Sequence, residues 1–140
     1  MAATLEDRCN AIEECYEFML AYAAQGLPGD AGSQSGSQLR DLLQRAIEAL
    51  SGLAETCAAR AQEASLEPAD RYQAFLTVLD RDAKDSLAAL ELVLAQPALS
   101  SQLIDNLNAS IHLRALLTDL FLIDEILKLQ KTAANSEGVS

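Results

Sequence analysis

The chain contains no tryptophan, and its 140 residues include only three phenylalanines, three tyrosines and three valines. Strands favour β-branched and aromatic residues, so this shortage argues against an extensive sheet. Half of the residues are nevertheless apolar, and most of these are leucine and alanine, which lose little side-chain freedom in a helix. The composition predicts an all-α protein, and the length suits a single domain.

Basic residues are also in short supply, with 10 lysines and arginines against 21 aspartates and glutamates, a formal net charge of −11. This excess of negative charge repels a phosphate backbone or an anionic membrane surface. The most apolar stretch, residues 111–129, is interrupted by charged side chains that are costly in hydrocarbon. We therefore expect neither nucleic acid nor membrane as a partner.

The three cysteines, Cys9, Cys15 and Cys57, are an odd number and have no CxxC spacing, which indicates buried thiols in a reducing compartment. The first residues lack the basic and apolar regions of a secretory signal, so a cytoplasmic protein is expected.

Residues with catalytic or metal-binding chemistry are scarce. The single histidine, His112, has no glutamate three residues before it, which excludes the Glu-x-x-His pairs of di-iron bundles. The glycines fit no phosphate-binding loop, and no nucleophile elbow accompanies the imidazole. The acidic group Glu13, Glu14 and Glu17 is interpreted as a solvated face. The sequence predicts a non-enzymatic protein without metal or cofactor.

Apolar residues recur at helical spacing in four segments, which predict helices over 5–25, 38–65, 68–95 and 101–130. Thr4 and Asp7 match a capping box at the first start, and Pro97 ends the third helix. These helices predict an antiparallel, up-down four-helix bundle in one domain, 1–130, followed by a flexible polar tail, 131–140. The segment 26–37, with four glycines, predicts a mobile loop.

The last helix has more apolar surface than one helix face can hold. At 100° per residue its apolar side chains form two stripes. One holds Ile104, Ile111, Ala115, Leu122, Ile126 and Leu129, and the other holds Leu113, Leu116, Leu120, Ile123 and Leu127. Two stripes predict contact on two sides, with the bundle core and with a second copy of the chain in a homodimer. Alternatively, this helix is the centre of an asymmetric bundle and is covered by its own neighbours.

Between the stripes lies a polar strip that includes Asn108, His112 and Asp119. Three interpretations are open: a solvated strip, a polar border that fixes the register of the interface, or a functional histidine. Asn108 and His112 are one turn apart in a continuous helix, so a hydrogen bond between them is expected.

The functional alternative has a concrete form, because His112-Leu113-Arg114 resembles the His-x-x-Lys-Gly motif of histidine phosphotransfer domains, which are acidic four-helix bundles of similar length. The resemblance covers about one helical turn. This chain departs from the motif at Ala115, where the family has glycine, and its histidine lies in the last helix. The resemblance implies a signalling domain phosphorylated at His112.

In size, charge and helix content the chain is also similar to small acidic helical chaperones of bacterial export systems, which shield partner segments with an apolar helix face. The resemblance implies a binding role. The sequence therefore predicts an adaptor, assembly factor or chaperone-like protein that binds itself and another protein. The expected interface residues are Ile111, Ala115, Leu122, Ile126 and Leu129, with Asn108, His112 and Asp119 as their polar border.

Overall fold

The computed structural model describes residues 3–139, with side chains described as far as Lys131. Within this range the chain is all-helical, as predicted, and contains six helices and no strand. In chain order the helices are α1 (Leu5–Ala23), α2 (Gln34–Leu50), α3 (Leu53–Glu63), α4 (Ala69–Leu94), α5 (Ser101–Ala109) and α6 (His112–Val139).

The start of α1 has the predicted capping box. The Asp7 amide donates to the Thr4 Oγ1 atom, and the Thr4 amide donates to the Asp7 carboxylate, each over 3.1 Å. Both exchanges satisfy amides that would otherwise lack a partner in the first turn. The predicted tail, 131–140, falls almost wholly outside the residues with described side chains, although the backbone of α6 is helical to Val139.

Two of the segments expected as continuous helices are each divided. The predicted helix 38–65 breaks between α2 and α3 at Gly52, which has a φ of +87° that suits glycine. The predicted helix 101–130 breaks between α5 and α6 at Ile111, which has a φ of +61°. A β-branched residue rarely adopts this conformation, so nothing in the local sequence indicated the second break.

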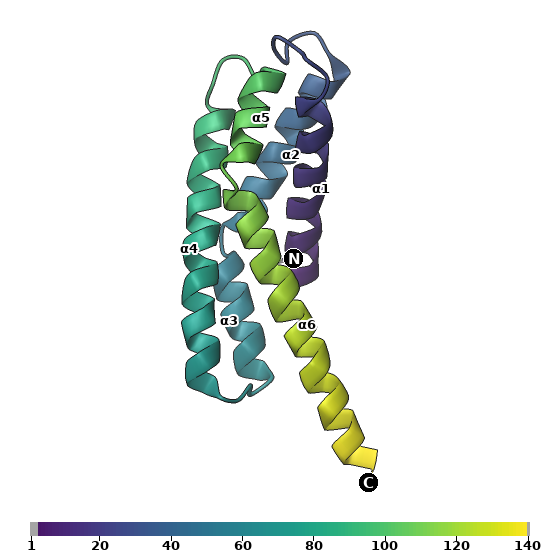
Figure 1. Cartoon of the computed structure of the whole chain (residues 1–140), viewed down its shortest axis with the longest axis vertical. Coiled ribbons are helices and arrows are strands. Elements are labelled where there is room, and N and C mark those ends of the chain that lie inside the picture. Colours follow the sequence, from purple (N-terminus) through teal and green to yellow (C-terminus); the bar gives the residue numbers. More distant parts are fainter. Residues whose placement is uncertain (1–2, 140) are drawn as a thin grey trace.

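The helices lie roughly along one long axis (Figure 1). Helix α1 packs mainly against α2 and α5, while α6 packs mainly against α4 and more lightly against α1. In Figure 1, α6 crosses the other helices obliquely, and its C-terminal end leans away from them. The residues buried at the centre come from all six helices, and the largest fully buried side chains include Tyr22, Ile12, Leu79, Leu99 and Leu116.

The segment between α1 and α2 is tied down, in contrast to the mobile loop predicted for 26–37. Its Asp30 carboxylate forms an ion pair with Arg40 of α2, and it accepts a hydrogen bond of 2.7 Å from the Leu99 amide. The backbone of Leu27 exchanges two hydrogen bonds of 2.9 Å with Ser101. These partners lie far along the chain, so the sequence pattern alone could not show that this loop is held.

Cys15 and Cys57 are buried and Cys9 is half-buried, and all three are free thiols. Burial raises the pKa of Cys9 to about 11 and that of Cys15 and Cys57 to about 12. These thiols therefore stay protonated and unreactive at neutral pH.

None of the helices, over the residues that the structure describes, has an apolar run sufficient to cross a bilayer.

Candidate functional site

Helix α6 is apolar on more than one side, and its inner side forms part of the core. Leu113, Leu116, Leu120 and Ile123 are buried against the bundle, and Leu127 is half-buried. These residues are the second stripe of the sequence analysis. Their burial uses one side of α6 and leaves the opposite side without a partner in a single chain.

The opposite side, which we call the outer face of α6, consists of Ile111, Ala115, Leu122, Ile126 and Leu129. Ile111 is 59% exposed, Leu122 is 49% exposed and Leu129 is 61% exposed. Ala115 and Ile126 are half-buried. Ile104, which the sequence analysis placed on the same stripe, is fully buried, because the break at Ile111 turns α5 away from the direction of α6.

The outer face borders a shallow apolar groove between α6 and α4. Arg71, Tyr72 and Phe75 of α4 line it together with Leu122 and Ile126, and it encloses about 290 Å³. The Gln130 side chain donates a hydrogen bond of 3.3 Å to the Tyr72 hydroxyl at its lower end. Sequence analysis missed the contribution of α4. Phe75, which is partly buried in the structure, is one of six aromatic residues in the sequence and was the signal that could have indicated it.

The structure does not bring the three residues of the polar border together. The Asn108 amide group donates a hydrogen bond of 3.3 Å to the Met19 carbonyl of α1, instead of bonding to His112. His112 is exposed at the first residue of α6, and its side chain makes no hydrogen bond within the described residues. Asp119 faces α4. The break between α5 and α6 separates Asn108 from His112 and Asp119, with which it would share a strip on a continuous helix.

Asp119 lies against a second carboxylate, Asp82 of α4. Burial, together with the hydrogen bond to and the charge of Asp82, raises the pKa of Asp119 to about 7. The Asp119 Oδ2 atom is buried and has no hydrogen-bond partner in the structure. The raised pKa favours the protonated, uncharged form of Asp119 beside the carboxyl group of Asp82.

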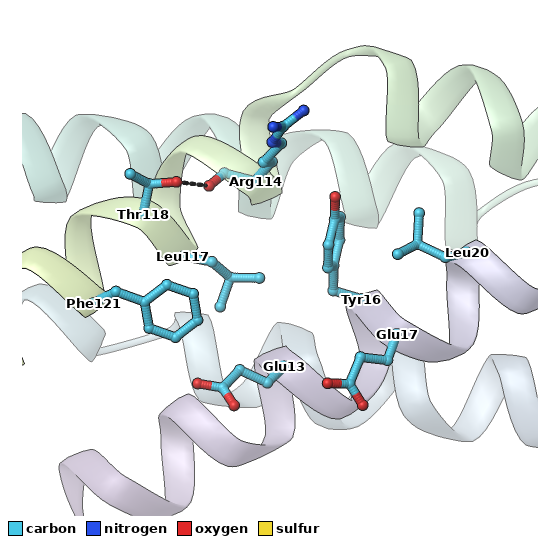
Figure 2. Close-up of a pocket in the computed structure, with 8 residues that line it drawn as sticks. All are labelled: Glu13, Tyr16, Glu17, Leu20, Arg114, Leu117, Thr118 and Phe121. Carbon is cyan, nitrogen blue, oxygen red and sulfur yellow. Dashed lines mark hydrogen bonds between the residues drawn. The ribbon is translucent and has the colours of Figure 1, made fainter.

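On its other flank, α6 borders α1 across a groove in which both helices expose apolar side chains (Figure 2). Tyr16 and Leu20 extend from α1, and Leu117 and Phe121 extend from α6. Leu20 is 48% exposed and Phe121 is 55% exposed. Sequence analysis named neither residue, because both lie off the regular apolar rows of their helices.

Charges on the described part of α6 are balanced, with Arg114, Lys128 and Lys131 against Asp119, Asp124 and Glu125. Lys128 forms an ion pair of 3.1 Å with Asp124 one turn away. The strong negative charge of the chain therefore resides on other helices. No cluster of three or more histidine, cysteine, aspartate or glutamate side chains suited to a metal ion occurs among the residues that the structure describes.

Comparison of this chain with protein-family models, with curated proteins and with solved structures gives no match. The geometry and chemistry of its surfaces are therefore the basis for a functional proposal.

Proposed function

We propose that the protein is a non-enzymatic interaction module that binds other polypeptides through the outer face of α6. The observation that supports this most directly is the exposure of Leu122 and Leu129 on α6 and of Ile111 just before it, because large apolar side chains left in water are a liability unless another surface covers them. The apolar groove beside Phe75 extends this surface onto α4.

The first partner in this proposal is a second copy of the chain, in a homodimer of four-helix bundles. Here α2 with α3 and α5 with α6 each count as one divided helix of the bundle. Balanced charge on α6 supports self-association, because two copies of a neutral face meet without the repulsion expected from a net charge of −11. Closed two-fold dimers are the commonest assemblies of small proteins.

The second partner in the proposal is another protein, so the chain acts as an adaptor, assembly factor or chaperone-like protein. We place it in the cytoplasm, where its three free thiols remain reduced. The high pKa values of these thiols and the exposed, unpartnered His112 offer no activated nucleophile, which supports a binding role over a catalytic one.

Leu122→Glu tests self-association. A charge on the outer face must be desolvated in the dimer, so we expect the dimeric mass to fall to that of a monomer in light scattering. Leu92→Glu is the matched control, because Leu92 is 67% exposed on α4 and lies outside the outer face. A wild-type protein that is monomeric at all accessible concentrations would contradict the dimer, as would equal effects of the two variants.

The exposure of His112 is the one structural observation that favours the alternative proposal, a histidine phosphotransfer domain, since a phosphorylated imidazole must be accessible to its partner. Incubation with phosphorylated response regulators or histidine kinases should then label the chain, and His112→Gln should abolish the label. Absence of label in the wild type, or a label that survives this substitution, excludes the alternative.

A further inference from the structure

The groove between α1 and α6 continues along most of α1. Its upper half encloses about 320 Å³ beside Tyr16, Leu20 and Leu117, as Figure 2 shows. Its lower half, of similar volume, lies beside Leu5 and Cys9. Glu13 and Phe121 line both halves, which are therefore adjacent along α1. From Leu5 to Leu20 this surface extends over about 22 Å at 1.5 Å per residue, the length of about four helical turns.

The wall that α1 contributes is acidic. Glu6, Glu13 and Glu17 line the groove, and none of the three makes an ion pair within the described residues. Figure 2 shows the Glu13 and Glu17 carboxylates on the α1 side and Arg114 on the far side, directed away from them. In this upper half the opposite charges are thus kept apart, whereas Arg60 of α3 and Lys128 of α6, which pairs with Asp124, line the lower half together with Glu6.

The only basic residue of α1 is Arg8, and its charge is used elsewhere. Its guanidinium donates to the carbonyl oxygens of Glu48, Ala49 and Ser51 at the C-terminal end of α2, over 3.3, 3.0 and 2.6 Å. This is the position where a cation stabilises a helix terminus. The acidic wall therefore receives no compensation from its own helix.

We propose that the α1–α6 groove binds an amphipathic helix of another protein, which inserts its apolar face against Leu20 and Phe121 and directs lysine or arginine side chains at Glu13 and Glu17. Helix-in-groove recognition needs an apolar floor of a few turns and specific polar groups at the rim. The groove offers both. Complementary charge at the rim selects the partner and sets its orientation.

The α1 side of this groove is acidic, whereas the outer face lies on a helix with balanced charge, so a second copy of this chain, with a net charge of −11, suits the outer face better than the groove. The inference also stands apart from self-association. The outer face residues Leu122 and Leu129 do not line this groove, so a Leu122→Glu monomer should retain it unchanged.

The test uses two synthetic helical peptides of about 16 residues, long enough to follow α1. Both carry leucines at i, i+3, i+4 and i+7 spacing, and one has lysines along the edge of that face where the other has glutamates. Fluorescence anisotropy at physiological salt should show at least roughly tenfold tighter binding of the lysine peptide. In amide NMR spectra, the shifts it causes should concentrate in α1 and in residues 113–128 of α6. Equal affinities, or no binding of the lysine peptide, would overturn the proposal.

Two pairs of variants locate the binding. The double substitution Glu13→Lys with Glu17→Lys should weaken lysine-peptide binding by roughly tenfold or more. The control, Glu14→Lys with Glu91→Lys, changes the net charge equally at exposed positions outside the groove. It should leave the affinity within about twofold of the wild type. Phe121→Ser should also weaken it, and Val78→Ser, at a 45% exposed position of α4, should not. Circular dichroism checks that each variant is folded.

Equal losses of affinity within either pair would show that the peptide responds to overall charge or to exposed apolar surface. That result would overturn the proposal that it binds in the groove. Binding by the lysine peptide that disappears in the Leu122→Glu variant would move the site to the outer face, which overturns this inference and leaves the proposed function intact.

Discussion

The two ends of this bundle are held together in different ways. At the end where α1 leads into α2, polar side chains cross-link segments far apart in the sequence: the Tyr22 hydroxyl donates to the Leu99 carbonyl over 2.6 Å, and Ser101 donates to the Tyr22 carbonyl over 2.7 Å. At the other end α6 leans away from its neighbours (Figure 1). Along α6, the apolar side chains of Phe121, Leu122 and Leu129 are exposed.

One small fold thus combines an end that is cross-linked by polar side chains with a helix that keeps apolar side chains exposed. Buried hydrogen bonds and ion pairs specify one arrangement, because leaving any of their members unpaired is costly. Apolar contacts are non-directional and let another polypeptide take the place of solvent.

Asp30→Ala should have the largest effect on stability. It leaves the Leu99 amide and the partly buried Arg40 guanidinium without their acceptor, so we expect a loss of about 2 kcal/mol in the free energy of unfolding. Urea denaturation followed by circular dichroism measures it. Asp41→Ala is the control, since its pair with Arg45 is exposed and contributes about 0.5 kcal/mol or less. Similar losses of stability in both variants would contradict the conclusion that the interactions of Asp30 hold this end of the bundle together.

Acid should weaken the same end. The hydrogen bond from Arg40 lowers the pKa of Asp30 from 3.8 to about 2, with a further contribution from the Leu99 amide. Because its pKa is lowered, the ionised Asp30 carboxylate stabilises the folded chain. Its contribution to the free energy of unfolding is complete above pH 3.8 and is lost as the pH falls towards 2. Arg40 is 34% exposed, so solvent screening limits the loss to about 1 kcal/mol. Denaturation at several pH values should show this loss of stability in the wild type. In the Asp30→Asn variant the free energy of unfolding should depend less on pH over this range.

Asp119→Asn should raise the free energy of unfolding, whereas Asp30→Ala lowers it, and its effect should be smaller. Because the pKa of Asp119 is raised to about 7 in the folded chain, folding is favoured by protonation, and stability falls as the pH rises from about 4 through 7. An amide removes the repulsion from Asp82, so we expect a gain of about 1 kcal/mol or less at pH 8, after screening. The gain should vanish near pH 4. A loss of stability at pH 8 would contradict the carboxyl pair.

Much of the helical pattern could be predicted from the sequence. The capping box at Thr4 and Asp7 is a local signal, and so is the alternation of polar and apolar residues that separates Leu116 and Leu120 from Leu122 on α6. The break at Gly52 was missed because an isolated glycine is tolerated inside a helical pattern. The break at Ile111 has no local signature at all, and with it the expected Asn108–His112 contact was wrong.

Composition and periodicity by themselves determined that this chain is helical, that it is acidic, and that its last helix has two apolar sides. Only the tertiary structure decided which side stays exposed, that Asp82 faces Asp119, and that an acidic wall of α1 lies beside Phe121. Helix formation depends on residues within a few positions of one another, whereas a groove depends on how two helices distant in the chain pack.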